Sequence, residues 1–306
     1  MKKRIFSFLL AACLILSTGA LCFAADTAEK TPCLHENAVW QTASKPTLFT
    51  DRYYVRKCPD CGFEQSAREA RSAYIVHAFD VMARLFFLND EPELSENFAV
   101  TAHTGPWELK QNGKPSLNYQ LISGADIIEF DLNLNSEGVA VMAHGDPEKA
   151  GGTLEEGFAR VAEFYGVMVN VDVKNVSAVS QAQELAIKYG ILDRIFYTGV
   201  GESDIPSVRE NSPLVPYYLN ASVPSDPSEC EKLCEKAVEL GAVGLNFSYT
   251  RYSPELAASA REHGLLLSIY TVNKLKDLRL CLTYDVDNIT TEYPYKLYTL
   301  TGGCGR

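Results

Sequence analysis

Basic residues and histidines are few in this chain. Its 306 residues hold 28 Lys and Arg against 39 Asp and Glu, which gives a formal net charge of −11 at pH 7, and there are only five histidines. Nucleic acids and anionic membrane surfaces attract basic proteins, so this charge argues against either as a partner. After residue 24 the sequence also lacks an apolar run of the roughly 20 residues that a membrane-spanning helix requires.

The N-terminus combines a basic start with an apolar segment. Met1-Lys-Lys-Arg4 precedes an almost wholly apolar stretch from Ile5 to Leu21, and Ala24 offers a small residue at a cleavage site. This pattern predicts a signal peptide over residues 1–24 and a secreted protein. Cleavage removes three basic and no acidic residues, which changes the charge from −11 to −14. The alternative is a lipobox, Leu10-Ala-Ala-Cys13, which would leave a lipid on Cys13 and hold the protein at the cell surface.

Residues 25–65 carry two pairs of metal-ligand side chains separated by a polar loop. The first pair is Cys33 and His35, and the second is Cys58 and Cys61. Each pair supplies two corners of a tetrahedron, so we predict a zinc-ribbon-like module with Zn²⁺ in a structural or adhesive role. A segment this short cannot bury a core of its own, and a metal ion would substitute for one. A disulfide, Cys33 to Cys58 or Cys58 to Cys61, is the alternative.

Residues 66–96 are predicted to link this module to a large domain. Apolar side chains recur there at near-helical spacing, from Tyr74 through Phe79 to Phe86, which predicts a linker helix. An acidic stretch from Asn89 to Glu96 then forms a polar turn. The following residues, 97–300, are long enough for one large domain.

Short apolar runs alternate with helical ones in this large domain. We expect strands at residues 98–103, 126–132, 167–173, 195–200, 214–220, 243–248, 265–272 and 287–291. We expect helices at residues 154–164, 177–189, 203–210, 228–240, 254–263 and 274–283. Strands with crossover helices predict an α/β fold, a closed (β/α)8 TIM barrel. An open doubly wound sheet is the alternative, but it would have a glycine-rich phosphate loop where this chain has His103-Thr-Gly-Pro106.

Ionisable side chains end, or directly follow, several of these apolar runs. They are His103, Glu129, Asp131, His144, Asp172 and Lys174. Barrel enzymes keep their catalytic residues at the carboxyl ends of strands. Side chains two residues apart on a strand share a face, so Glu129 joins Asp131 and Asp172 joins Lys174. Carboxylates bind hard divalent cations, and imidazoles exchange protons near neutral pH. The set therefore predicts metal-assisted acid–base chemistry.

In combination, the motifs of residues 98–297 resemble those of the glycerophosphodiester phosphodiesterases. That family has His-Arg-Gly after its first strand, then Gly-Ala-Asp, Glu-x-Asp, a hairpin ending in His-Asp, Asn-Ile-Glu-x-Lys, aromatic-Thr-Val-Asn and Asp-x-Ile-x-Thr-Asp-x-Pro. The matching segments here are His103-Thr-Gly105, Gly124-Ala-Asp126, Glu129-Phe-Asp131, Gly138 to Asp146, Asn170-Val-Asp172-Val-Lys174, Tyr270-Thr-Val-Asn273 and Asp287 to Pro294.

The resemblance implies a metal-dependent hydrolase that releases glycerol 3-phosphate and an alcohol from small-molecule glycerophosphodiesters. By matching positions, the catalytic residues would be His103 and His144, the ligands of a Ca²⁺ or Mg²⁺ ion Glu129, Asp131 and Asp172, and the substrate-binding residues Lys174 and Tyr270. In that family the attacking group can be a neighbouring hydroxyl of the substrate, which gives a cyclic phosphate that water opens.

Some positions depart from the family pattern. Thr104 stands where the family has arginine, which removes a bidentate phosphate donor. Asp172 replaces a longer glutamate, Glu292 replaces an aspartate, and only Pro115-Ser-Leu117 represents a Pro-Glu-Asn turn. Two alternatives therefore stay open. One is a noncatalytic cell-surface module that binds phosphodiesters. The other is a related phospholipase or lyase, which the lack of a long hydrophobic insertion disfavours.

Overall fold

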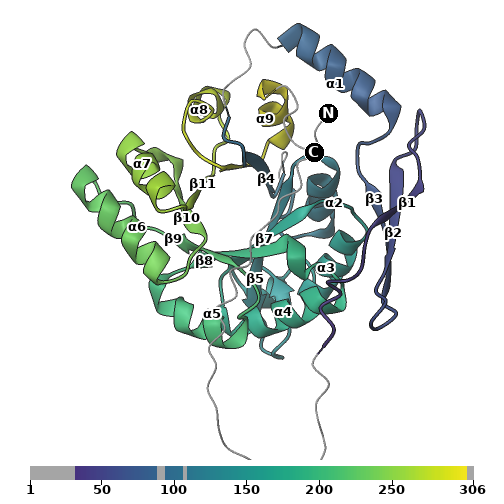
Figure 1. Cartoon of the computed structure of the whole chain (residues 1–306), viewed down its shortest axis with the longest axis horizontal. Coiled ribbons are helices and arrows are strands. Elements are labelled where there is room, and N and C mark those ends of the chain that lie inside the picture. Colours follow the sequence, from purple (N-terminus) through teal and green to yellow (C-terminus); the bar gives the residue numbers. More distant parts are fainter. Residues whose placement is uncertain (1–31, 88–93, 106–108, 302–306) are drawn as a thin grey trace, which may run out of the picture.

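The computed structural model describes residues 32–87, 94–105 and 109–301. The predicted signal peptide, residues 1–24, and Cys13 within it lie outside this part of the chain. No helix in the described ranges combines the length and the apolar character needed to cross a bilayer. The described chain forms a small antiparallel sheet followed by a large barrel (Figure 1).

Parallel strands close into a ring in the large domain. Their order is β4-β12-β11-β10-β9-β8-β7-β5, and pairing of β5 with β4 closes it. The strands are β4 (Ala99–His103), β5 (Ile127–Leu134), β7 (Met168–Val173), β8 (Ile195–Val200), β9 (Tyr217–Asn220), β10 (Gly244–Ser248), β11 (Leu266–Tyr270) and β12 (Asn288–Thr291). A short strand, β6 (Ala140–Met142), runs antiparallel to β5. The predicted strands and the (β/α)8 barrel are confirmed.

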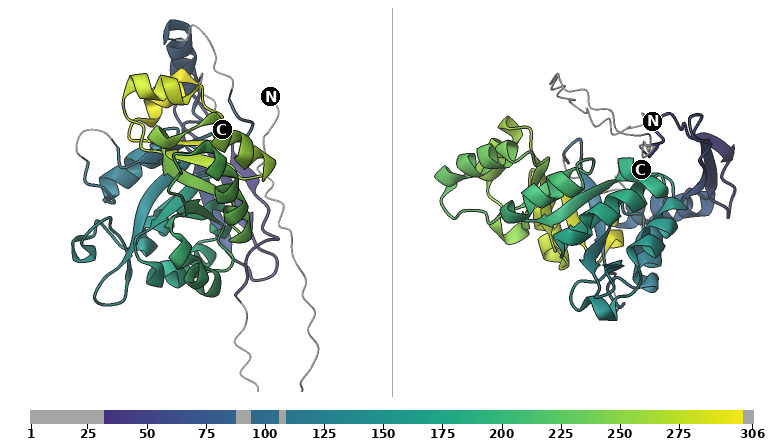
Figure 2. Two further views of the ribbon diagram at one scale, coloured as in Figure 1. Left: turned by 90° about the vertical axis from the view of Figure 1, so that its left-hand side faces the viewer. Right: turned by 90° about the horizontal axis from the view of Figure 1, so that it is seen from below.

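A helix follows each barrel strand and covers the outside of the ring (Figures 1 and 2). The helices are α2 (Lys114–Ile122), α3 (Leu154–Ala162), α4 (Val179–Lys188), α5 (Ile205–Asn211), α6 (Cys230–Glu239), α7 (Pro254–Glu262), α8 (Leu275–Cys281) and α9 (Pro294–Leu300). The predicted helices correspond to α3 through α8. The sequence did not predict α2 or α9. The only apolar side chains that α2 buries are Leu117 and Leu121, so it has little helical periodicity to detect.

Side chains that point into the barrel are apolar at its bottom, where the strands begin. Successive strand residues face opposite sides, so every second residue points inward. Ala99, Ile127, Phe196 and Tyr218 form a buried cluster separate from the main core, with Met168, Val243 and Leu266 packed against it. The rings of Phe196 and Tyr218 lie 5.3 Å apart. These side chains fill the bottom of the barrel, which is a packed core rather than a pore.

Hydroxyl and amide side chains fill the next level of the interior. Thr101 donates to Asn288 (2.8 Å), Asn288 to Ser268 (2.9 Å), Thr198 to Asn170 (2.7 Å) and Asn246 to Asn220 (2.9 Å). Because these buried groups satisfy one another, they avoid the cost of about 1–3 kcal/mol that an unpaired buried polar group carries. Ionisable residues follow above this level, at the carboxyl ends of the strands.

The N-terminal module is a three-stranded antiparallel sheet. In it, β1 (Gln41–Ser44) pairs with β2 (Arg52–Lys57), which pairs with β3 (Glu64–Glu69). The linker helix expected from residue 66 begins later, because residues 66–69 belong to β3 and α1 runs Tyr74–Phe87. Burial alternates along β3, with Gln65 and Ala67 buried, so this segment has the periodicity of a strand. Helix α1, which follows β3, contacts α9 of the barrel.

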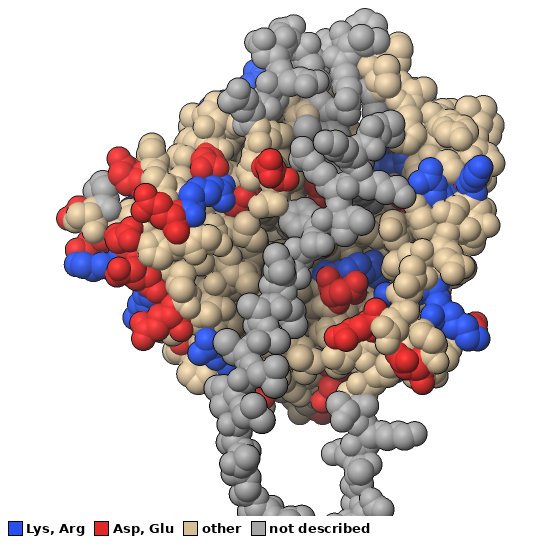
Figure 3. All heavy atoms as spheres, viewed as in Figure 1, with Lys and Arg blue, Asp and Glu red and all other residues tan. Residues whose placement is uncertain are grey.

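Exposed acidic side chains gather at one edge of the molecule. Figure 3 shows them on the left, where Figure 1 places α6, and Glu231, Glu235 and Glu239 of that helix are exposed. The exposed Lys232 and Lys236 of the same helix lie among these carboxylates and offset part of their charge.

Candidate active site

The ionisable residues expected at strand ends meet at one end of the barrel. His103 ends β4, Glu129 and Asp131 lie on β5, Asp172 lies on β7, and Lys174 follows β7. Strand pairing sets His103 beside Glu129 and Asp131 beside Asp172. This is the carboxyl end of the strands, at which barrel enzymes bind their substrates.

Asp131 is the centre of the hydrogen-bond network at this end. Its side chain is 1% exposed, and its Oδ1 lies 3.0 Å from His144 Nδ1 and 3.2 Å from Lys174 Nζ. Its Oδ2 accepts hydrogen bonds from Gln111 Nε2 (2.9 Å) and Asn112 Nδ2 (2.7 Å). The Asn112 oxygen in turn accepts from the backbone N–H of Asp131 at 2.9 Å. These partners fix the carboxylate before any ligand binds, which is the preorganisation that a site requires.

Gln111 and Asn112 were not among the site residues expected from the sequence. They lie in the loop after β4, just before the segment matched to the family's Pro-Glu-Asn turn. Gln111 Nε2 also lies 3.3 Å from His103 Nε2, so this side chain bridges His103 and Asp131. Asn112 has a φ of 60°, a left-handed conformation that asparagine adopts more readily than most residues. An asparagine in a polar loop after a strand was the available signal, and it is a weak one.

Ionisation of Glu129 is strongly disfavoured in the cation-free site. Its side chain is 3% exposed, and its carboxylate lies 3.5 Å from His103 Nε2. Burial raises the pKa of Glu129 well above its ordinary value, and the negative charges of Asp131 and Asp172 raise it further. A cation bound beside these carboxylates would favour the ionised form of Glu129 and so lower its pKa.

Asp172 and Lys174 form an ion pair beside Asp131. Lys174 Nζ lies 2.8 Å from Asp172 Oδ2. Burial raises the pKa of Asp172, and the Lys174 ammonium limits this rise. Burial lowers the pKa of Lys174, but the carboxylates of Asp172 and Asp131 outweigh burial and raise it overall. The ammonium is therefore charged and already paired with carboxylates before a phosphate arrives.

The second oxygen of Asp172 depends on a glycine in the neighbouring strand. This Oδ1 atom is buried without a hydrogen-bond partner among the described residues. It packs against Gly199 of β8, which has a φ of 73°, and a Cβ at Gly199 would come within 2.2 Å of it. Any larger residue would collide with this oxygen and with the backbone of Val173, so Asp172 and the end of β7 can take these positions only beside a glycine.

The carboxylates of Glu129, Asp131 and Asp172 fit a divalent cation. One oxygen from each lies within 4.8 Å of the other two. Ca²⁺ and Mg²⁺ bind oxygen ligands at about 2.0–2.6 Å, so one ion can reach all three. Two further features indicate a cation here: the buried Asp172 oxygen that lacks a hydrogen-bond partner among the described residues, and the raised pKa of Glu129. A cation would supply a partner to the first and a compensating charge to the second.

The two histidines occupy different environments. His103 is 23% exposed, and burial lowers its pKa although the carboxylates of Asp131 and Glu292 oppose this. His103 is therefore neutral at pH 7 and able to accept a proton. His144 is 62% exposed, with Nδ1 directed at Asp131 Oδ1. The carboxylate fixes this ring and leaves Nε2 available to a substrate, as in a catalytic triad.

Thr104 adopts a strained backbone conformation directly after His103. Its φ is 53°, which is rare for a β-branched residue. The Thr104 carbonyl accepts a hydrogen bond from Ser116 Oγ, and its Oγ1 lies 3.4 Å from His103 Nδ1. This turn helps to hold the His103 ring at the site, and strain of this kind is common at functional sites.

Tyr270 ends β11 and is half-buried near the carboxylates. Burial raises its pKa, and the negative charge of Asp172 adds to the effect. Its position at the carboxyl end of a strand is compatible with the wall expected for the glycerol. The predicted zinc ligands lie in the N-terminal module, where Cys33, His35, Cys58 and Cys61 come together as a separate group.

No protein-family model and no curated protein matches this sequence. Solved structures do match it. A glycerophosphodiester phosphodiesterase from Parabacteroides distasonis is 19% identical, over 69% of this chain and 98% of that one, with a TM-score of 0.55. One from Agrobacterium tumefaciens is 16% identical, over 65% of this chain and 99% of that one, with a TM-score of 0.53.

A third match was solved with a ligand. It is a phosphodiesterase from Oleispira antarctica in complex with the product sn-glycerol-3-phosphate, 19% identical over 66% of this chain and 96% of that one, with a TM-score of 0.56. At such identities the likeness establishes the fold. The barrel of this protein has the fold of the glycerophosphodiester phosphodiesterases.

Proposed function

We propose that this protein hydrolyses glycerophosphodiesters to glycerol 3-phosphate and an alcohol, with a divalent cation held by Glu129, Asp131 and Asp172. The observation that carries the proposal is the meeting of three carboxylates and two imidazoles at the carboxyl end of a closed barrel. The fold shared with solved phosphodiesterases supports the same class of reaction, and one of these was solved with glycerol 3-phosphate.

The carboxylates serve to hold the cation. When bound, a Ca²⁺ or Mg²⁺ ion would polarise the phosphoryl oxygens and offset their negative charge. Glu129 and Asp131 come from β5 and Asp172 from β7, and the pairing of these two strands fixes the spacing of the ligands. Lys174 adds a positive charge beside them, which favours the approach of an anionic diester.

The histidines divide the proton transfers between them. His103, which is neutral, suits the general base that accepts the proton of the attacking hydroxyl, whether from water or from the substrate. His144 suits the general acid, which donates a proton from Nε2 to the departing alcohol oxygen. Asp131, 3.0 Å from His144 Nδ1, orients this ring.

Release of glycerol 3-phosphate from a panel of glycerophosphodiesters tests the proposal. We expect release to require a divalent cation and to fall by about a hundredfold or more in His103→Ala. His77→Ala is the matched control, because His77 is exposed on α1. Wild-type rates in a chelator, or in the His103→Ala variant, would contradict the proposal.

One observation favours a second candidate, a noncatalytic phosphodiester-binding module. Thr104 occupies the position of the family's arginine, so the phosphate has no guanidinium partner there. Lys174 is already engaged by two carboxylates. Calorimetric binding of a glycerophosphodiester without any release of product would favour this candidate over the enzyme.

We also propose that the protein acts outside the cytoplasm, secreted or at the cell surface. The support is the pattern of residues 1–24, which lie outside the described chain. Mass spectrometry of the mature N-terminus tests this. A chain beginning at Ala25 in the medium supports secretion, a lipid on Cys13 supports surface anchoring, and retention of Met1 would contradict both.

A further inference from the structure

We propose that Cys33, His35, Cys58 and Cys61 bind a structural zinc ion that fastens the N-terminal sheet to the bottom of the barrel. This inference is independent of the phosphodiesterase proposal, because the cluster shares no residue with the carboxylate site. The geometry and chemistry of the ligand atoms bear on the identity of the metal, and the contacts between the module and the barrel bear on its mechanical role.

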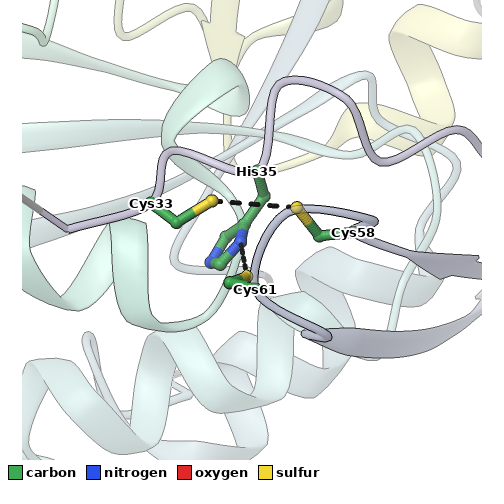
Figure 4. Close-up of side chains that lie close together, drawn as sticks. All are labelled: Cys33, His35, Cys58 and Cys61. Atoms are coloured by element: carbon green, nitrogen blue, oxygen red, sulfur yellow. Dashed lines mark hydrogen bonds between the residues drawn. The ribbon is translucent and has the colours of Figure 1, made fainter.

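The four side chains converge on one point. Figure 4 shows them directed toward one another from two separate segments of the chain. Cys33 Sγ lies 3.7 Å from Cys58 Sγ, and Cys61 Sγ lies 3.3 Å from His35 Nδ1. All four ligand atoms lie within 4.8 Å of one another. Tetrahedral zinc with Zn–S bonds of about 2.3 Å separates two sulfurs by about 3.8 Å, which agrees with the first distance.

The chemistry of the ligands selects zinc. Thiolates and imidazole are soft or borderline ligands that bind Zn²⁺ and disfavour Ca²⁺ and Mg²⁺, which prefer oxygen. A disulfide between Cys33 and Cys58 would require their sulfurs to approach from 3.7 Å to about 2.05 Å, and it would leave His35 and Cys61 without a purpose. Four protein ligands fill a tetrahedral site, so the ion would have no open position for a substrate and would be structural.

The backbone is shaped to present these ligands. His35 has a φ of 59°, which is unusual for a residue with a Cβ. In the second segment, the backbone N–H of Gly62 donates to the Cys58 carbonyl at 2.9 Å, and that of Cys58 donates to the Phe63 carbonyl at 2.8 Å. These bonds close a tight turn that brings Cys58 and Cys61 to the same side.

The cluster is continuous with the barrel through an aromatic ring. The His35 imidazole stacks on Phe63, with ring centroids 4.1 Å apart. Phe63 packs on Gly190, which follows α4 with a φ of 62°, and a Cβ there would lie 2.8 Å from the Phe63 ring.

Strands β2 and β3, which flank the Cys58–Cys61 turn, supply hydrogen bonds to two helix ends. Gln65 Nε2 donates to the Ala162 carbonyl at the end of α3 (3.0 Å) and to the Tyr189 carbonyl after α4 (3.3 Å). The buried Arg56 donates to the Gly190 carbonyl. Carbonyls at the C-terminus of a helix have no partner within the helix, and a cation there is favoured by the helix dipole.

These contacts lie at the bottom of the barrel. The segments after α3 and α4 lead into β7 and β8, so the module contacts the barrel at the end opposite the carboxylate site. Further bonds run from the backbone N–H of Arg68 to the Glu163 carbonyl (2.9 Å) and from that of Tyr165 to the Arg68 carbonyl (2.8 Å). That end of a barrel serves stability rather than catalysis. Loss of zinc should therefore destabilise the barrel and leave the chemistry of its opposite end intact.

Metal analysis of the purified protein tests the zinc site, and thermal unfolding tests its fastening role. We expect about one zinc per chain, and Cys58→Ser should lose it and unfold at a Tm lower by roughly 5 °C or more. Cys281→Ala, which removes a buried thiol of α8, should keep the zinc. Gly190→Ala should keep the zinc but lower the Tm, because the methyl group would displace Phe63 and Arg56.

A second glycine separates this displacement from backbone strain. Gly166 also has a positive φ, 74°, but has open space where its Cβ would be. Gly166→Ala should therefore lower the Tm less than Gly190→Ala does. Absence of zinc, with or without a Cys33–Cys58 crosslink in the mass spectrum, would overturn the metal site. A protein that holds zinc but whose Cys58→Ser and Gly190→Ala variants unfold at the wild-type temperature would overturn the fastening role.

Discussion

Replacing Glu129 by glutamine should stabilise the cation-free protein and weaken its stabilisation by a divalent cation. Glu129 is 3% exposed. Its pKa lies well above the ordinary 4.5 because of burial, first, and then because of the charges of Asp131 and Asp172. Glutamine keeps the shape of the side chain but carries no charge for these neighbours to repel. It also removes one of the three proposed ligands.

The size of the stabilisation can be bounded in two ways. Charges no more than 4.8 Å apart repel each other by at least about 3 kcal/mol at an effective dielectric constant of 20. Protonation limits the penalty, because a carboxyl group with the ordinary pKa of 4.5 takes up a proton at pH 7 at a cost of about 3 kcal/mol. Lys174 offsets part of the repulsion. We therefore expect a gain of about 2 kcal/mol, or roughly 4–8 °C in Tm.

The pH dependence follows from the direction of the shift. The folded protein keeps the Glu129 proton at pH values at which the unfolded chain has lost it, so the wild type loses stability as pH rises above 4.5. The difference in Tm between Glu129→Gln and the wild type should therefore vanish at pH 4.5 and below. It should be largest at neutral pH. Thermal unfolding in EDTA across this range, followed by circular dichroism, measures it.

The control for this experiment is Glu137→Gln. Glu137 is exposed in the turn between β5 and β6, so its charge should have little effect on Tm at any of these pH values. With added Ca²⁺ or Mg²⁺, the wild type should gain more stability than Glu129→Gln. A Glu129→Gln variant that melts below the wild type in EDTA at pH 7, or equal gains from the cation in both proteins, would contradict the proposed role of the Glu129 charge.

Four further substitutions test the site. His103→Ala and His144→Ala should each slow hydrolysis about a hundredfold or more. The rate of the double variant should fall by far less than the product of the two single losses, because the two residues act as a unit. Losses that multiply would argue against a shared mechanism. Thr104→Gly should raise the free energy of unfolding, measured by urea denaturation, by about 1 kcal/mol, because glycine adopts a φ of 53° without strain. A lower free energy of unfolding would argue against backbone strain at Thr104. Gly199→Ala should weaken the affinity for the cation about tenfold or more by displacing Asp172. An unchanged affinity in calorimetry would show that Gly199 does not position Asp172 for the cation.

The barrel was predictable because its strands are strongly patterned. Buried parallel strands are apolar over their length, and the runs ending at His103, Asp131 and Val173 stand out for this reason. The alternation of side chains along a strand likewise predicts that Glu129 and Asp131 share one face of β5. Helix α2 escaped prediction because polar side chains such as Gln120 are buried in it by tertiary contacts, which local periodicity does not register.

Contacts between segments that are far apart in the sequence could not be predicted from local patterns. The hydrogen bonds of Gln111 and Asn112 to Asp131 form only once a loop folds over the barrel mouth. The docking of Arg56 and Gln65 on the ends of α3 and α4 joins residues 134 and 97 positions apart. The spacing of the four proposed zinc ligands was visible in the sequence, but the barrel surface that the module contacts was not.

The most direct test of the proposed hydrolysis is ³¹P NMR of a glycerophosphodiester incubated with the wild-type protein. We expect the diester signal to be replaced by that of glycerol 3-phosphate when Ca²⁺ or Mg²⁺ is present, and to persist in EDTA. A diester that binds to the cation-loaded protein and yields no monoester would contradict the account and leave a binding module in its place.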